Sequence, residues 1–182
     1  MTAAMIVVDM LNPYEHEDAA PLAASVGGML DDLSELIAAA RDERLRIVYV
    51  NDNHGDWTAG PKDIAQRALA GARPDLIEPV LPPDDVPFIT KARHSIFYET
   101  LLEYFLQREK VSRLVLAGQV TEQCILYSAL DGYVRHFDMV IPTDAVAHID
   151  ERMAQAAIRM METNMHAQLA TGPEAVLRAC RA

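Results

Sequence analysis

Short runs of aliphatic and β-branched residues alternate with longer segments of helical periodicity along the whole chain. This alternation is typical of α/β proteins, because each helix of a βαβ unit carries the chain back to start the next parallel strand. The sequence therefore predicts a three-layer αβα fold of the flavodoxin or Rossmann type, with helices on both faces of a parallel six-stranded sheet. The expected strands are Met5–Val8, Arg46–Val50, Phe88–Thr90, Arg113–Ala117, Met139–Ile141 and Gln168–Ala170.

Apolar residues that recur every three or four positions predict the helices between these strands. Asp150 is the expected N-cap of one helix, which has Met153, Ala157 and Met160 on its inner stripe. Residues 51–87 are rich in Gly, Pro and Asp, so they are expected to form long active-site loops with one short helix. The expected helices are 28–44, 64–70, 99–108, 122–135, 150–163 and a last one that begins at Pro173.

The length and charge of the chain limit what it can bind. With 182 residues, of which 51% are hydrophobic, it is expected to fold as a single domain over residues 1–182. Lys and Arg number 16 against 27 Asp and Glu, and the resulting net charge of −11 repels phosphate backbones and anionic lipids. We therefore expect a small-molecule substrate, and neither a nucleic acid nor a membrane partner.

The N-terminal and cysteine patterns indicate a cytoplasmic location. The stretch MTAAMIVVDM has no basic region before its apolar run, which Asp9 interrupts too soon for a signal peptide. Cys124 and Cys180 lie too far apart in a chain with no other cysteine to form a disulfide framework or a four-ligand zinc site.

Polar residues follow three of the expected strands, at the edge where open α/β sheets bind their ligands. Asp9 follows IVV, Lys91 follows FIT, and Cys124 lies just past LVLAG at the start of the next helix. A thiol needs a proton acceptor and a compensating cation to act as a nucleophile, and Asp9 and Lys91 are suited to these roles. The alternative is an ordinary Asp9–Lys91 ion pair beside a buried, inert cysteine.

These residues occur within longer motifs: IVVDMLNPY at 6–14, YVNDN at 49–53, KARHSIFYETLLEYFL at 91–106 and LVLAGQVTEQCILYSALDGYVRHF at 114–137. In their order and spacing the motifs resemble the isochorismatase-like, or cysteine hydrolase, superfamily over nearly the whole chain. That superfamily includes nicotinamidases, N-carbamoylsarcosine amidases and ureidoacrylate amidohydrolases.

The resemblance implies roles for the residues of these motifs. Cys124 is the implied nucleophile, Asp9 the general base and later acid, and Lys91 the group that tunes both. A cis peptide between Gln119 and Val120 is implied as well, and it turns the Val120 N–H toward the substrate. With the N–H of Cys124 this donor would form an oxyanion hole.

The implied reaction is hydrolysis of a C–N bond in a small amide or ureido compound, through a thioester and with release of ammonia. Members that cleave a vinyl ether typically carry glycine where this chain has Cys124, so the cysteine favours C–N hydrolysis. The resemblance also implies a homo-oligomer, a dimer or higher. No cofactor is expected.

Weaker signals leave alternatives open. Asp52 and His54 stand where nicotinamidases begin a metal site, but the intervening loop offers no further histidine before His94, so a catalytic metal is not expected. A metal-dependent nicotinamidase and a catalytically silent binding or scaffold protein remain the rival functions. Five side chains are candidates either for the substrate pocket or for packing: Tyr14, Trp57, His94, Phe97 and Tyr98.

Overall fold

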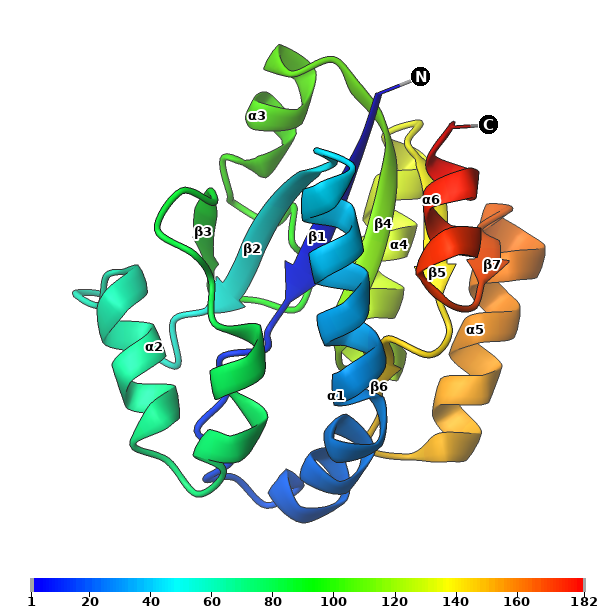
Figure 1. Ribbon diagram of the computed structural model, residues 1–182. Coiled ribbons are helices and arrows are strands. Elements are labelled where there is room, and N and C mark those ends of the chain that lie inside the picture. Colours follow the sequence, from blue (N-terminus) through cyan, green and yellow to red (C-terminus); the bar gives the residue numbers. More distant parts are fainter. Residues whose placement is uncertain (1, 182) are drawn as a thin grey trace.

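A parallel seven-stranded sheet forms the centre of the computed structural model, which describes residues 2–181 (Figure 1). The strand order is β3-β2-β1-β4-β5-β7, and the short β6 pairs with the end of β4. The strands are β1 Thr2–Val8, β2 Arg46–Asp52, β3 Phe88–Lys91, β4 Val111–Gln119, β5 Asp138–Pro142, β6 Val146–Ala147 and β7 Gln168–Ala170. All six expected strands are present, and the two-residue β6 is the one that the sequence pattern did not indicate.

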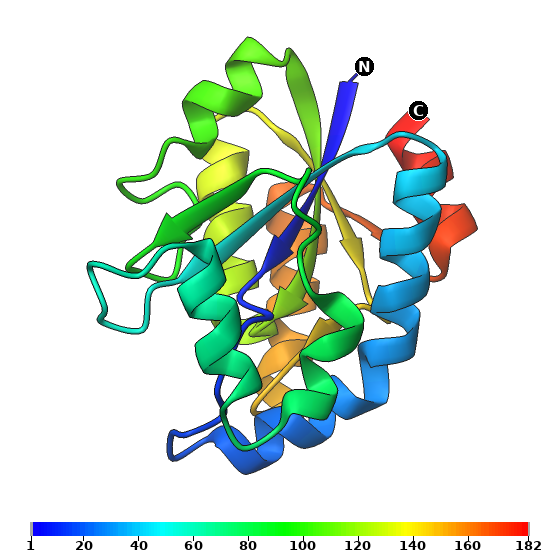
Figure 2. The ribbon, with the colours of Figure 1, turned by 60° about the vertical axis from the view of Figure 1, so that its left-hand side comes forward.

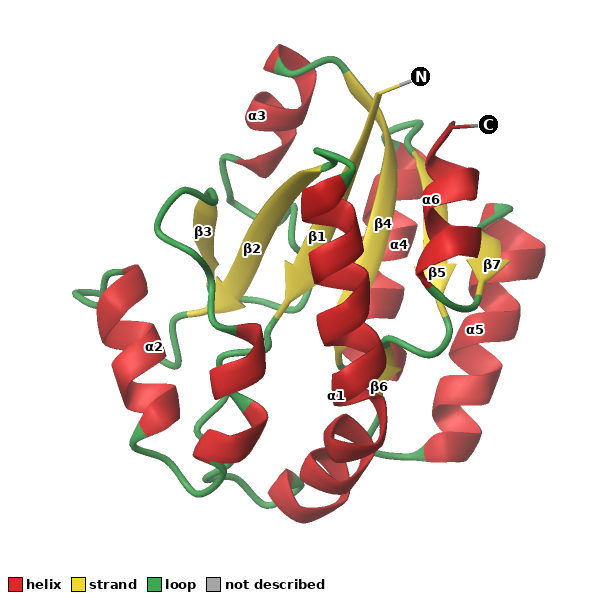
Figure 3. Ribbon diagram, viewed as in Figure 1, coloured by secondary structure: helices red, strands yellow, loops and turns green. Residues whose placement is uncertain are grey.

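Helices cover both faces of this sheet, which confirms the predicted three-layer α/β architecture (Figures 2 and 3). Side chains from α1 and α6 pack on one face, and side chains from α3, α4 and α5 pack on the other. The helices are α1 Ala19–Asp42, α2 Pro61–Leu69, α3 Leu102–Arg108, α4 Leu126–Val134, α5 Glu151–Met165 and α6 Pro173–Arg181. Two 3₁₀ turns, Pro74–Leu76 and Glu78–Val80, follow α2, and a single π-helical turn, Thr121–Ile125, precedes α4.

Strand β1 shows why the strand motifs are apolar without alternation. Met5 and Val7 belong to the core under α1, whereas Ile6 and Val8 belong to the core under α4. Because a central parallel strand is covered on both faces, each of its side chains is buried. Since β1 is parallel to its neighbours β2 and β4, the carboxyl ends of all three strands lie at the same edge of the sheet.

Several helix starts differ from the prediction, and the reasons are clear for α1 and α3. Helix α1 begins at Ala19, well before the expected Gly28, because the buried Leu22 and Val26 extend the apolar stripe past the glycine pair. A helical glycine costs about 1 kcal/mol relative to alanine, and burial of Leu22 and Val26 offsets that cost. Helix α3 begins at Leu102 rather than at Glu99, whose φ of 52° is incompatible with a right-handed helix.

Helix α5 begins as expected, since the Asp150 side chain accepts a hydrogen bond from the N–H of Met153. Its expected inner stripe was right for the buried Ala157 and wrong for Met153 and Met160, which are 59% and 46% exposed. The buried stripe consists of Ala154, Ala157, Met161 and Met165, so two alanines and two methionines other than the expected ones pack on the sheet. No helix within residues 2–181 has both the length and the apolar character needed to cross a membrane.

Candidate active site

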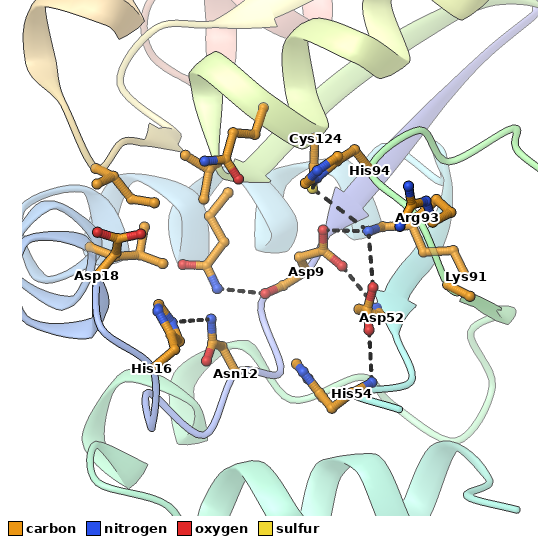
Figure 4. Close-up of a pocket in the computed structure, with 16 residues that line it drawn as sticks. Asp9, Asn12, His16, Asp18, Asp52, His54, Lys91, Arg93, His94 and Cys124 are labelled. Atoms are coloured by element: carbon orange, nitrogen blue, oxygen red, sulfur yellow. Dashed lines mark hydrogen bonds and ion pairs between the residues drawn. The ribbon is translucent and has the colours of Figure 1, made fainter. Parts of the chain in front are cut away.

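The carboxyl ends of β1, β3 and β4 bring Asp9, Lys91 and Cys124 together (Figure 4). Asp9 follows the last residue of β1, Lys91 ends β3, and Cys124 lies in the π-helical turn after β4. The Lys91 Nζ atom lies 2.8 Å from Asp9 Oδ2 and 3.7 Å from Cys124 Sγ. The ammonium group therefore bridges the carboxylate and the sulfur, as the strand-end positions led us to expect.

Backbone and side-chain hydrogen bonds fix the orientation of Asp9. Its φ of 54° turns the chain sharply after β1, while its N–H donates to the Val50 carbonyl at 2.9 Å. The N–H of Asp52 donates to Asp9 Oδ1 at 2.9 Å, so the carboxylate binds Asp52 with one oxygen and Lys91 with the other. Gln119 Nε2 donates to the Asp9 carbonyl, which links the end of β1 to the end of β4.

Lys91 is a buried cation, only 3% exposed. Burial alone lowers the pKa of its ammonium, but the negative charges that Asp9 and Cys124 can carry more than offset this effect, and the pKa is raised. Lys91 is therefore protonated throughout the physiological range and supplies a permanent positive charge at the base of the site.

Cys124 is 8% exposed, and its pKa is raised well above that of a free thiol. Burial is the largest cause and the Asp9 carboxylate the next, whereas Lys91 and a hydrogen bond from the backbone of Val120 act in the opposite direction. At neutral pH the sulfur is therefore a thiol beside a carboxylate. The thiol has to lose its proton before the sulfur can act as a nucleophile, and the neighbouring Asp9 carboxylate can accept that proton.

The turn that carries Cys124 is held from several sides. The peptide between Gln119 and Val120 is cis, as the motif resemblance implied. Before it, Gly118 has a φ of 112°, and a Cβ at this position would lie 2.2 Å from the Val8 carbonyl oxygen. Only glycine fits where β4 passes this close to β1. After it, the buried Glu122 accepts hydrogen bonds from the N–H groups of Ile149 and Asp150 through Oε1.

A cavity of about 370 Å³ opens above the three residues. This volume lies at the small end of the range for ligand sites and suits a compact substrate. Charged and polar groups surround it, among them Arg93 and Asp18. The lining residues outside the Asp9, Lys91 and Cys124 group are Asn12, His16, Asp18, Leu22, Asp52, His54, Ala92, Arg93, His94, Gln119, Val120, Gln123 and Ile149.

Comparison with known proteins places the chain in a family. The sequence profile of the Isochorismatase domain matches residues 3–174. The chain belongs to the isochorismatase family. The uncharacterized isochorismatase family protein YaaI of Bacillus subtilis is 32% identical over 168 residues, which cover 92% of this chain and 93% of YaaI.

Two further relatives of this isochorismatase-family chain carry names that state an activity. Ureidoacrylate amidohydrolase RutB of Methylorubrum extorquens is 28% identical over 191 residues, covering 89% of this chain and 77% of RutB. The crystal structure of nicotinamidase PncA from Bacillus subtilis superposes with a TM-score of 0.73 at 26% identity, covering 93% of this chain and all of PncA.

Of the five pocket candidates of this isochorismatase-family chain, only His94 lines the cavity formed by residues 2–181. His94 Nδ1 lies 3.6 Å from Cys124 Sγ, and its ring contacts that of Tyr127 at a centroid distance of 5.4 Å. Nothing in the sequence distinguished this histidine from its neighbours, since the turns at 92–101 decide which side chains point inward.

The other four candidates lie elsewhere, which corrects their expected place in the pocket wall. Tyr14 is buried beside the site and donates its hydroxyl to Gln119 Oε1 at 3.3 Å, while Phe97 is a core residue stacked on Phe137. Trp57 and Tyr98 are 81% and 55% exposed, because their loops direct them to the surface.

Asp52 and His54 of this isochorismatase-family chain are fewer than the three protein ligands that a catalytic divalent metal takes. Asp52 Oδ1 accepts the N–H of His54, and Oδ2 lies 3.9 Å from the Lys91 ammonium. His54 Nε2 lies 2.9 Å from the Leu11 carbonyl and donates its proton there, which leaves Nδ1 as the nitrogen of this ring that could bind a metal. Within residues 2–181 no group of three or more His, Cys, Asp or Glu side chains is placed to hold a metal ion.

Sequence reasoning missed several residues of the site. Gln119 joins Asp9 to Tyr14, Glu122 anchors the nucleophile turn, and Asn51 receives the N–H of Leu11. Each is a polar residue at or just past the end of an apolar strand, the same signal that identified Asp9 and Lys91.

Proposed function

We propose that this chain is a cysteine hydrolase that cleaves a C–N bond of a small amide or ureido compound and releases ammonia. The observation that carries the proposal is the position of the Lys91 ammonium between the Asp9 carboxylate and the Cys124 sulfur, at the base of a small polar cavity. The activities for which RutB and PncA are named, both C–N hydrolyses, support the same class of reaction.

In the acylation step, Cys124 Sγ attacks the substrate carbonyl carbon while its proton passes to Asp9. Because the pKa of the thiol is raised, attack and proton transfer belong to one step rather than starting from a stored thiolate. Asp9 then returns this proton to the nitrogen of the tetrahedral intermediate. The C–N bond breaks, ammonia leaves, and the acyl group remains on sulfur as a thioester.

Deacylation uses the same residues in reverse. A water molecule loses a proton to Asp9 as its oxygen attacks the thioester carbon, the C–S bond breaks, and Asp9 returns the proton to sulfur. Lys91 keeps its charge throughout and stabilises whichever neighbour is negative. The N–H groups of Val120 and Cys124 are the proposed oxyanion donors, each worth roughly 10²–10³ in rate.

The donor set favours this proposal over a metal-dependent nicotinamidase. Asp52 and His54 have no third His, Cys, Asp or Glu side chain placed beside them among the described residues, and the proposed steps need only Asp9, Lys91 and Cys124.

Ammonia release tests the proposal. The wild-type protein is incubated with a panel of primary amides, nicotinamide and ureido acids, and ammonia is measured by a coupled assay. For every compound that is turned over, Cys124→Ala is expected to lose at least about 10³ in rate, as nucleophile removal does elsewhere.

Cys180→Ala is the matched control, because Cys180 is buried in α6 and does not line the cavity. This variant is expected to keep wild-type turnover. Turnover that survives in Cys124→Ala would refute the nucleophile, and a panel without any turnover would favour the silent scaffold.

A further inference from the structure

The Cys124 sulfur has a polar neighbour that the proposed steps do not use. His94 Nδ1 lies 3.6 Å from Cys124 Sγ, as close to the sulfur as Lys91 Nζ at 3.7 Å. His94 belongs to the loop that follows β3, and Figure 4 shows its ring beside the sulfur. The sulfur is therefore in contact with an imidazole as well as with the Asp9 carboxylate and the Lys91 ammonium.

The His94 ring is held in this position by the helix that follows the nucleophile. It packs against the Tyr127 ring, with centroids 5.4 Å apart and planes inclined at 56°. Tyr127 lies three residues after Cys124, at the start of α4, so the two side chains project from the same side of the helical segment. The same segment consequently positions both the sulfur and the imidazole.

His94 has a free proton acceptor, whereas both oxygens of the Asp9 carboxylate are already engaged. Asp9 Oδ1 accepts the N–H of Asp52, and Oδ2 lies 2.8 Å from the Lys91 ammonium. The Nε2 atom of His94 makes no hydrogen bond within residues 2–181, and its ring lines the cavity. A neutral imidazole has one N–H, so Nδ1 can accept the thiol proton while Nε2–H faces the cavity.

The charges around His94 leave an imidazolium free to act on the sulfur. Lys91 is shared between two carboxylates, Asp9 at 2.8 Å and Asp52 at 3.9 Å, whereas His94 forms no ion pair within residues 2–181. An imidazolium would therefore stabilise the thiolate without a competing carboxylate in contact. The charged and titratable groups that adjoin His94 in the cavity or contact its ring are Asp9, Asp52, Lys91, Arg93, Cys124 and Tyr127.

We propose that His94 is a further catalytic residue, which acts beside Asp9 as a second acceptor of the Cys124 thiol proton. The S–H bond breaks, an N–H bond forms at Nδ1, and the electron pair stays on sulfur, so a minor thiolate–imidazolium pair exchanges with the thiol. The use of this pair in catalysis rests on the proposed hydrolysis. As the thiolate attacks the carbonyl carbon, Nε2 gives its proton to the leaving nitrogen and the imidazole becomes neutral again.

The pair produces a characteristic dependence of thiol reactivity on pH. Thiol with imidazole and thiolate with imidazolium hold the same number of protons, so their ratio does not change with pH. Above about pH 6.5, where histidines ordinarily lose their proton, the thiolate supplied by the pair is therefore constant. A thiol without such a partner loses about tenfold of its thiolate for each unit by which the pH falls. Attraction across about 4 Å raises the thiolate fraction by up to about 1000-fold, which solvent in the cavity reduces to about 10- to 100-fold.

The rate of Cys124 alkylation by iodoacetamide, measured from about pH 6 to 10, tests the pair. Between about pH 6.5 and 7.5 the wild-type rate is expected to change by about fourfold or less, and that of His94→Gln more steeply, by up to about tenfold. At about pH 6.5 His94→Gln is expected to be roughly 5- to 50-fold slower than the wild type, a difference that disappears by about pH 9. His94→Phe keeps a ring against Tyr127 without a basic nitrogen and should behave like His94→Gln.

His16→Gln is the matched control, because it removes an imidazole of the same cavity that contacts Asn12 and lies across the cavity from the sulfur (Figure 4). It is expected to keep the wild-type dependence of alkylation on pH. Circular dichroism confirms that each variant is folded.

Alkylation in both His94 variants as fast as in the wild type at about pH 6.5 would overturn the proposal. Faster alkylation would overturn it equally, since it would show that the ring only shields the sulfur, and so would a His16→Gln protein that behaves like His94→Gln. The measurement uses no substrate, so its outcome is decided separately from the proposed hydrolysis.

Discussion

Replacing Asp9 with asparagine should make Cys124 more reactive toward alkylation while abolishing turnover. The Asp9 carboxylate is within hydrogen-bonding reach of the thiol, and after burial it is the main cause of the raised Cys124 pKa. The neutral asparagine side chain would remove that negative charge and leave the Lys91 ammonium, 3.7 Å from the sulfur, as the only full charge of the triad. In this variant the Lys91 ammonium stabilises the Cys124 thiolate alone, because no Asp9 carboxylate competes for its charge.

The size of the effect follows from Coulomb's law. Two charges about 4 Å apart interact by about 4 kcal/mol at an effective dielectric constant of 20, which corresponds to about 3 pKa units. Since part of this is lost to relaxation of the amide and of Lys91, we expect the pKa of Cys124 to fall by about 1–3 units. Below the pKa each unit raises the thiolate fraction tenfold, so alkylation at pH 7 should accelerate by about 10- to 1000-fold.

The assay is the rate of iodoacetamide modification of Cys124 against pH, resolved by peptide mass spectrometry, with Cys180 as a reference thiol in the same molecule. Asp18→Asn is the matched control, because Asp18 lines the same cavity outside the triad, and it should leave the alkylation rate near that of the wild type. Turnover by Asp9→Asn should fall by at least about 10², the usual contribution of a general base. Slower alkylation of Cys124 in Asp9→Asn than in the wild type would refute the reasoning.

Four further predictions concern the triad, its support and the absence of a metal requirement. Lys91→Met leaves the Asp9 carboxylate without its buried partner and should lower the free energy of unfolding by about 3–5 kcal/mol, measured by urea denaturation at pH 7; a loss below about 1 kcal/mol would contradict the buried pair. The wild-type pKa values of Lys91 and Cys124 are both raised, so their contribution to stability is present at neutral pH, and it should be lost as the pH rises above the ordinary thiol and lysine values of about 8.5 and 10.4; melting temperatures recorded from about pH 7 to 11 check this sign. Gly118→Ala places a Cβ 2.2 Å from the Val8 carbonyl oxygen and should cost at least about 3 kcal/mol, seen as a lower melting temperature, whereas Gly28→Ala, with open space around its Cβ, should not destabilise the protein. Prolonged treatment with a chelator should leave ammonia release unchanged, and a loss that zinc, iron or manganese restores would show that Asp52 and His54 bind a metal after all.

The sequence pattern was sufficient for the sheet and for the convergence of Asp9, Lys91 and Cys124. Runs such as those of β1 and β4 are apolar without interruption because both sheet faces are covered, and the carboxyl ends of parallel strands share one edge. A polar residue directly after such a run is therefore placed to within a few ångströms by strand order alone. No comparable rule fixes β6, a two-residue strand whose pairing depends on tertiary contacts.

The rest of the pocket depends on loop conformation, which periodicity does not encode. His94 lines the cavity while Phe97 enters the core and Tyr98 points to solvent, although all three follow Lys91 in one irregular segment. On α5 the apolar character of Met153 suggested burial, whereas the close packing of that helix required Ala154 to face inward. In both segments, side chains of similar apolar or aromatic character lie on opposite sides of the backbone. The backbone geometry alone determines which of them face inward.

The central claim is that Cys124 carries an acyl group during the reaction, and rapid acid quenching followed by intact-mass and peptide analysis tests it most directly. With the best substrate of the panel, the account predicts a transient adduct on the Cys124 peptide whose mass equals that of the substrate less ammonia. The adduct should be absent from Cys124→Ala. Continued ammonia release with no adduct on Cys124, or with the adduct on another residue, would contradict the account.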